Sequence, residues 1–252
     1  MNKKRIDQLL VEKKIAETRT KAKAMVMAGQ IFVNEKKVNK SGELFNQDVN
    51  IYAKKISSEW VSRGAYKLIE CINFYKVSIK DKICLDLGAS TGGFTQVLLK
   101  KGATKIYSVD VGKNQLHEKL IKEKKVVSIE KQNARYLSKE MIKDEIDIIV
   151  CDVSFISMKK VIEPNLKFLK NNGEIISLIK PQFEAYKKEI KKGIVVDTNV
   201  HDRICKEYEN WFKSNYFNVV GIVKSPLTGP KGNIEFLIYC IILLISGSIT
   251  VL

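Results

Sequence analysis

The spacing of hydrophobic positions differs between the first 58 residues and the rest of the chain. From residue 83 onward, short apolar runs alternate with segments whose apolar residues recur every three to four positions. The runs predict buried strands, and the spaced segments predict helices. We expect strands at 83–87, 105–110, 126–129, 146–152, 174–179, 218–224 and 234–240, and helices at 116–122, 159–170 and 202–214. This alternation predicts an α/β fold with a parallel, doubly wound sheet.

The first 58 residues follow a different pattern. The apolar residues of 6–15 lie on one helical face, and 18–28 predicts a second helix, which Gly29 ends. A short hairpin at 31–38 turns at Asn34-Glu35. We therefore expect a small α+β domain with its linker at 1–58, a larger domain at 59–240 and an atypical apolar tail at 241–252.

Charge favours a polyanionic partner. The chain carries 44 Lys and Arg against 28 Asp and Glu, a net charge of +16. The excess is densest up to Glu59, with 13 basic against 7 acidic residues. Such a balance indicates nucleic acid first and an anionic membrane second. A compact basic unit suits phosphate contacts with folded RNA. The RNA-facing side chains we expect are Arg5, Arg19, Lys21, Lys23 and Arg63.

A glycine turn follows the apolar run at 83–87. The turn spans Gly88 to Gly93 and leads into an apolar-periodic segment, which is the entrance of a nucleotide-binding unit. Its spacing is not that of a phosphate-binding loop. The next strand ends on Asp110, whose carboxylate can hold the two hydroxyls of a ribose. Dinucleotide enzymes and S-adenosylmethionine (SAM) enzymes share these features, and a tight turn without a ligand is a third interpretation.

Charged residues stand at or beside the ends of three other predicted strands. Asp152 and Lys180 each follow an apolar run, and Glu235 precedes the last one. Charges in such positions are costly unless they pair with one another. Together, opposite the glycine turn, they predict a site. The five cysteines are scattered without metal-ligand spacing, and the N-terminus has no apolar signal core. We expect no metal and a reducing cytoplasm.

The N-terminal domain resembles the S-four RNA-binding module. The resemblance rests on Arg5-Ile6-Asp7 and on residues 18–22, 28–31, 33–34 and 38–40. The usual Asn-Gly turn of the module is replaced here by Asn34-Glu35.

Almost the whole chain resembles the TlyA family of rRNA ribose methyltransferases, whose catalytic domain is FtsJ-like. The shared motifs occupy residues 62–68, 86–94, 152–157, 180–184 and 229–236. The resemblance implies a catalytic tetrad of Lys67, Asp152, Lys180 and Glu235. It also implies SAM as the cofactor, bound by Asp86, Gly88, Ala89, Ser90, Thr91, Gly92, Gly93 and Phe94 on the methionine side, Asp110 at the ribose, and Asn133, Ala134 and Arg135 at the adenine.

The resemblance further implies methyl transfer to a ribose 2′-hydroxyl of ribosomal RNA, of the cytidine type, and the chemistry of the four residues fits such a transfer. That hydroxyl is a poor nucleophile, so either a nearby ammonium stabilises the alkoxide or a neutral lysine removes the proton. We assign this role to Lys180. Asp152 would tune and orient Lys180, and Lys67 and Glu235 would position the hydroxyl. We expect a cytoplasmic monomer acting on ribosomal subunits or their RNA. The sequence leaves open the nucleotide, the subunit and whether intact subunits are needed.

A membrane-active cytolysin is the alternative function. Members of the TlyA family are often labelled haemolysins, and the basic surface and the uncharged segment 236–252 would serve that activity. The segment is marginal for a membrane span, which needs about 20 apolar residues. We expect it to form a final strand followed by a tail, and we do not favour a membrane contact.

Overall fold

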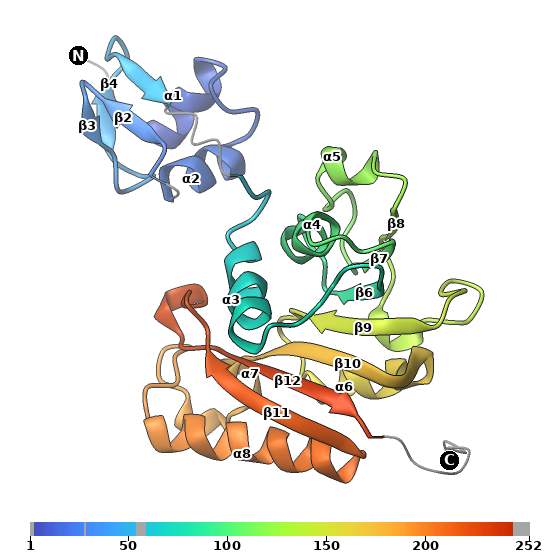
Figure 1. The fold of residues 1–252 in the computed structure, drawn as a ribbon. Helices are drawn as coiled ribbons and strands as arrows, with labels where there is room; N and C mark the ends of the chain where they lie inside the picture. Colours follow the sequence, from blue (N-terminus) through green and yellow to red (C-terminus); the bar gives the residue numbers. More distant parts are fainter. Residues whose placement is uncertain (1–2, 28, 54–58, 244–252) are drawn as a thin grey trace. The chain divides into compact units, whose positions relative to one another are not determined.

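The computed structural model describes residues 3–27, 29–53 and 59–243, and the chain divides into two compact units, Met1–Glu59 and Trp60–Leu252 (Figure 1). Three expectations fall outside the described residues: most of the polar linker, at 54–58, the tail beyond 243, and position 28 of the S-four motif.

The first unit is a small α+β domain. Helix α1 (Ile6–Glu12) packs against α2 (Arg19–Met27), and both cover β2 (Ile31–Val33). In the predicted hairpin, Asn34 and Glu35 both have positive φ, 47° and 66°, which is the backbone of a two-residue turn that usually takes glycine at its second position. Three short strands, at residues 3–5, 44–46 and 51–53, had no periodic signal in the sequence. Strand β2 pairs with β3 (Lys36–Lys37) and β5 (Ile51–Ala53), and β1 (Lys3–Arg5) pairs with β4 (Leu44–Asn46).

The second unit is built on a seven-stranded sheet, which confirms the α/β fold class. The strand order is β11-β12-β10-β9-β6-β7-β8. The bounds are β6 (Ile83–Leu87), β7 (Lys105–Val109), β8 (Val126–Ile129), β9 (Ile146–Cys151), β10 (Leu169–Ile179), β11 (Phe217–Lys224) and β12 (Phe236–Ile242).

The sheet is not wholly parallel, contrary to the expectation. Strand β12 lies antiparallel between β10 and β11. The loop 225–235 that joins β11 to β12 contains only a one-turn 3₁₀ helix, η4 (Pro230–Gly232), and a connection this short returns the chain beside the strand it left. The reversal has a consequence for the site, because it brings Glu235, the residue just before β12, to the edge where β10 ends.

Helices cover both faces of this sheet (Figure 1). On one face lie α3 (Ala65–Tyr75), α4 (Gly93–Lys100) and α5 (Glu118–Ile121). On the other lie α6 (Lys159–Ile162), the 3₁₀ segment η2 (Glu163–Phe168) and α8 (Thr198–Ser214). Strand residues alternate between the two hydrophobic cores, with Cys84 in the first and Leu85 in the second.

The helix expected at 159–170 is wrong in its second half. The α-helix ends at Ile162, a 3₁₀ segment follows, and β10 already begins at Leu169. Pro164 has no backbone N–H and occupies the first turn of the 3₁₀ segment. The irregular stretch between Leu169 and Glu174 then interrupts the pairing of β10 with β9.

Candidate active site

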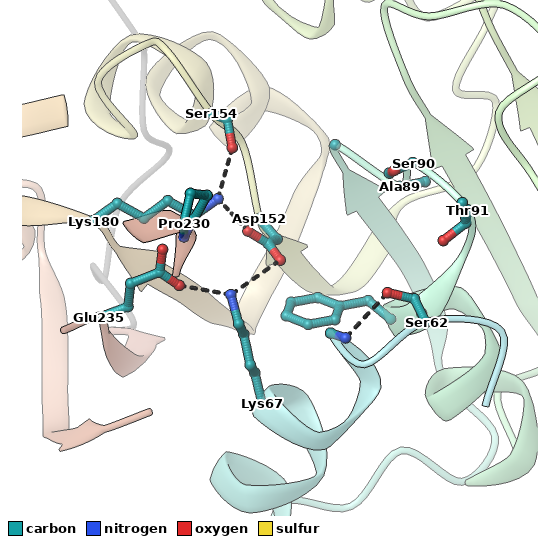
Figure 2. A pocket seen from close by; sticks show the side chains of 14 residues that line it. Ser62, Lys67, Ala89, Ser90, Thr91, Asp152, Ser154, Lys180, Pro230 and Glu235 are labelled. Carbon is teal, nitrogen blue, oxygen red and sulfur yellow. Dashed lines mark hydrogen bonds and ion pairs between the residues drawn. The ribbon is translucent and has the colours of Figure 1, made fainter. Parts of the chain in front are cut away.

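Four charged side chains meet at the carboxyl edge of the sheet (Figure 2). Lys180 Nζ lies 2.5 Å from Asp152 Oδ1, and Lys67 Nζ lies 2.6 Å from Glu235 Oε2. Lys67 Nζ is also 4.0 Å from Asp152 Oδ2, which joins the two pairs. Glu235 is only 1% exposed and Lys180 only 7%. Two cations and two anions thus form one neutral, largely desolvated network, in which electrostatic interactions are stronger than in water.

Strand register explains why residues so far apart in sequence meet. Ile179 of β10 is paired with Phe236 of β12, so the residues just outside this pair, Lys180 and Glu235, stand side by side. Cys151 of β9 is paired with Ser177 of β10, which places Asp152 at the same edge. Lys67 comes from the first turns of α3.

Two uncharged residues complete the network, and the sequence had not singled them out. Ser154 Oγ accepts a hydrogen bond from Lys180 Nζ at 2.9 Å, and Gln182 Nε2 donates to Glu235 Oε1 at 3.0 Å. Both lie inside motifs that carried the family resemblance, 152–157 and 180–184. Gly229 leaves room for the glutamate, since a Cβ there would lie 2.1 Å from Glu235 Oε1.

The glycine turn borders the same network. Gly88 has φ of 86°, and a Cβ on it would lie 2.9 Å from the carbonyl oxygen of Asp152. Only glycine therefore allows the turn after β6 to lie against the end of β9. A cavity of about 200 Å³ is lined by this turn and by all four charged residues; its other lining residues include Ala89, Ser90, Thr91, Gly93 and Phe94.

A second cavity of about 350 Å³ shares Gly88, Ser90, Asp152 and Ser154 with the first. Asp110 lines it, and its two carboxylate oxygens accept hydrogen bonds from the backbone N–H groups of Ser90 and Gly112 at 2.8 and 2.7 Å. Asn133 and Ala134 line it as well. Seven further lining residues were not among the predicted site residues: Val109, Val111, Gln132, Val153, Phe155, Ile156 and Val161.

Three residues expected at the cofactor line neither cavity. Gly92 has φ of 95° and faces Leu116 and Leu120. Arg135 directs its side chain to Asn133 Oδ1 at 3.3 Å. Asp86 is fully buried behind the turn, where Oδ2 accepts a hydrogen bond from Thr95 Oγ1 at 2.6 Å. Burial raises the pKa of this carboxyl to about 7.

Comparison with known proteins places the chain. Residues 60–240 match the FtsJ-like methyltransferase family, and residues 4–47 match the S4 domain. The 16S/23S rRNA (cytidine-2′-O)-methyltransferase TlyA of Mycobacterium tuberculosis is 34% identical over 93% of this chain and 88% of its own length. The chain belongs to the TlyA family. Hemolysin A of Brachyspira hyodysenteriae is 42% identical over 94% of this chain and 100% of its own.

A solved structure supports this TlyA-family fold. A Streptococcus thermophilus protein described as a hemolysin superimposes with a TM-score of 0.75 at 36% identity, covering 96% of this chain and 90% of its own. None of the described helices is long and apolar enough to cross a membrane. Within the described ranges, no three metal-ligating side chains gather in a group.

In the S4 domain of this TlyA-family protein, two of the expected RNA-facing arginines share one buried acid. Asp7, which is 0% exposed, accepts hydrogen bonds from Arg5 Nε and Nη2 at 3.1 and 3.2 Å and from Arg19 Nη2 at 3.1 Å. Both arginine side chains stay about half exposed. Lys21 pairs with Glu17, and Lys23 is exposed. Arg63, the fifth expected residue, is exposed in the second unit.

Replacing Asp7 by asparagine should loosen the S4 domain. The hydrogen bonds from Arg5, above all, lower the pKa of Asp7, so its stabilisation is present at neutral pH and is lost only as the pH falls through the lowered value. We expect backbone amides of Ile31–Val33 to exchange about tenfold faster at pH 7 in Asp7→Asn, measured by hydrogen exchange on the full chain. Glu17→Gln, which removes only an exposed pair, is the control; equal exchange in both variants would contradict the prediction.

Proposed function

We propose that this protein transfers a methyl group from SAM to a ribose 2′-hydroxyl of ribosomal RNA, as a cytidine-type 2′-O-methyltransferase. The carrying observation is the Lys67–Asp152–Lys180–Glu235 network at a cavity that also borders the glycine turn (Figure 2). An intact network of two lysines and two acids serves proton handling beside a methyl donor. It has no evident use in a membrane-active protein, so we do not propose the cytolysin alternative.

The donor set fits SAM as the cofactor. Each carboxylate oxygen of Asp110 accepts one backbone N–H, and each keeps a lone pair that a ribose hydroxyl could use. Gly88 and Ser90 would hold the methionine part, and Asn133 and Ala134 the adenine. When bound, SAM supplies an electrophilic methyl group on a cationic sulfonium, which the nearby carboxylate of Asp152 favours.

The chain's own residues would prepare the hydroxyl. Lys180, in its neutral form, would take the proton from the 2′-oxygen, and Asp152 would stabilise the ammonium that results. Lys67 would donate to the developing alkoxide while Glu235 fixes its position. Because the four side chains hold one another, little rearrangement is needed as charge develops.

The substrate class follows from the S4 domain and the charge. Arg5 and Arg19, fixed side by side by Asp7, would present their remaining N–H groups to RNA phosphates. Lys21, Lys23 and Arg63 would add exposed positive charge. Ribosomal RNA, within subunits or free, is the proposed partner.

The test is transfer of labelled methyl from SAM to ribosomal RNA from a strain that lacks this gene. Small subunits, large subunits and each free RNA are offered separately. We expect label in at least one RNA, and we expect it in alkali-resistant dinucleotides, because a 2′-O-methyl group blocks hydrolysis of the adjacent phosphodiester. The position of the resistant dinucleotide then identifies the nucleotide.

Three outcomes would contradict the proposal. Label found on the base rather than on the ribose would show that the reaction is base methylation. Absence of label in every RNA, with SAM binding intact, would remove ribosomal RNA as the substrate. Leakage of liposomes at protein concentrations that give no methyl transfer would favour the cytolysin alternative.

A further inference from the structure

We propose that Ser154 is a positioning residue that aims the side-chain nitrogen of Lys180 at the substrate hydroxyl. The inference rests on the proposed function, because it assigns a partner to the lysine that would accept the proton. Within the described residues, Ser154 forms no hydrogen bond with Lys67, with Glu235 or with the backbone of the glycine turn.

The geometry around Lys180 Nζ carries the proposal. A lysine nitrogen has three tetrahedral positions besides its bond to Cε. Ser154 Oγ, at 2.9 Å, accepts a hydrogen bond from one of them, whereas Asp152 Oδ1, 2.5 Å from the nitrogen, forms an ion pair with it and has no hydrogen-bond partner among the described residues (Figure 2). Across the described part of the chain, no third oxygen pairs with Nζ. Lys180 lines the cavity between the network and the glycine turn, so the third position is the one available to a substrate.

The hydrogen bond to Ser154 limits where the lone pair lies. Neutral lysine has two N–H groups and one lone pair. Ser154 holds one N–H, and the carboxylate of Asp152 attracts the other, so the lone pair is left to the third position. The proton taken from the 2′-hydroxyl then becomes the third N–H, and the contacts with Ser154 and Asp152 are kept. With Asp152 alone, rotation about the Cε–Nζ bond could turn the lone pair away from the hydroxyl.

Two contacts, one of them through the 90% exposed ring of Phe155, connect the loop of Ser154 with the segment that follows Lys180. Phe155, the next residue, has φ of 64°, a left-handed conformation that turns the loop sharply. Its ring packs against Phe183 with centroids 5.1 Å apart, and the N–H of Met158 donates to Glu184 Oε1 at 3.0 Å. Both partners belong to α7 (Pro181–Glu184), which starts directly after Lys180. The loop that carries Ser154 and the segment that carries Lys180 are therefore joined at two further points.

The experiment compares Ser154→Ala, Ser154→Thr and Ser157→Ala. Ser157 is a matched control in the same loop, because its hydroxyl lies 3.1 Å from the hydroxyl of Tyr208 and not at Lys180. For Ser154→Ala we expect kcat for methyl transfer to fall about 30-fold, the size of a lost hydrogen bond to a charged group. KM for RNA and the dissociation constant for SAM should stay within about twofold. Ser154 is exposed, so the extra methyl of threonine has room, and Ser154→Thr should restore most of kcat.

A second measurement does not depend on the substrate. In protein labelled with ¹⁵N at lysine side chains, the Lys180 signal, assigned by its loss in Lys180→Met, should move in Ser154→Ala and stay unchanged in Ser157→Ala. An unmoved signal would overturn the positioning role, whether or not the wild type methylates ribosomal RNA. A fall in SAM affinity with kcat unchanged would make Ser154 a cofactor contact instead. A wild type with no transfer to RNA but a signal that moves would sink the proposed substrate and keep the Ser154–Lys180 bond.

Discussion

Replacing Lys180 by methionine should lower kcat for methyl transfer about 1,000-fold and leave the dissociation constant for SAM nearly unchanged. A positioned acid or base contributes on the order of 10²–10⁴ to a rate, and Lys180 would also stabilise charge on the hydroxyl oxygen. Methionine keeps an unbranched side chain of similar length in a position that is 7% exposed. Asp152 keeps a positively charged neighbour in the variant, because Lys67 Nζ lies 4.0 Å from its Oδ2. The measurement is single-turnover transfer at saturating SAM, with SAM binding followed by calorimetry.

Charge balance makes the second half of this prediction specific. The network of two lysines and two acids is neutral, so removing one lysine leaves a net negative charge beside the cavity. A cationic cofactor is not repelled by that change, and its affinity should be kept. Lys124→Met, which removes an exposed lysine from the same unit, is the control and should change neither quantity. Equal losses of kcat and SAM affinity in Lys180→Met would indicate a collapsed site and contradict the assignment.

Lys180→Arg separates the two roles left open for this lysine. Arginine keeps the positive charge but is not deprotonated in proteins. If Lys180 takes the proton, Lys180→Arg should be about as slow as Lys180→Met. If Lys180 acts only by its charge, the arginine variant should keep a substantial part of kcat, provided that circular dichroism shows it folded.

Part of the fold could be predicted because burial leaves a plain mark on the sequence. Strands at 83–87 and 126–129 have the predicted bounds, since their apolar runs are flanked by turns. The direction of β12 could not be predicted, because an apolar run looks alike in a parallel and an antiparallel strand. The end of the helix after Ile162 depends on Pro164, a residue that the periodic spacing of apolar positions does not weigh.

For the site, the sequence pointed to charged residues and missed their uncharged partners. Asp152, Lys180 and Glu235 could be found because charges beside apolar strands are rare and costly. Ser154 and Gln182 carry no such mark, since serine and glutamine are ordinary loop residues and only their contacts reveal them. Motif membership also does not distinguish a residue that lines a cavity from one packed behind it. Gly93 and Asp86 lie in one motif, yet only Gly93 lines a cavity.

Asp86→Asn should change the pH dependence of stability. Burial raises the pKa of Asp86 from 3.8 to about 7. The contribution of this group to the stability of the wild type is therefore fully present below pH 3.8 and is lost as the pH rises through 7. The whole shift corresponds to about 4 kcal/mol, of which about 3 kcal/mol falls between pH 5 and pH 8. Asparagine does not titrate. The free energy of unfolding of Asp86→Asn, relative to that of the wild type, should therefore rise by about 3 kcal/mol from pH 5 to pH 8.

The change with pH is the readout, not the sign at one pH. The NH2 group of asparagine takes the place of the buried oxygen Oδ1, which has no hydrogen-bond partner among the described residues. The cost of burying this donor is the same at every pH. Urea unfolding can be followed by tryptophan fluorescence, because both tryptophans, Trp60 and Trp211, lie in the second unit. Asp202→Asn, an exposed acid of the same unit, is the control. A stability difference that stays constant from pH 5 to pH 8 would contradict the raised pKa.

The same variant decides whether Asp86 acts on the cofactor. Family resemblance placed it among the SAM ligands, whereas in the structure its carboxyl lies behind the turn, bonded to Thr95, whose hydroxyl also lies 2.8 Å from that of Ser108. If Asp86 only supports the turn from behind, Asp86→Asn should bind SAM within about threefold of wild type at pH 8, because asparagine keeps an oxygen for the Thr95 hydroxyl. A loss of affinity that is large at pH 8 and small at pH 5 would instead show that the ionised carboxylate itself favours the cationic cofactor.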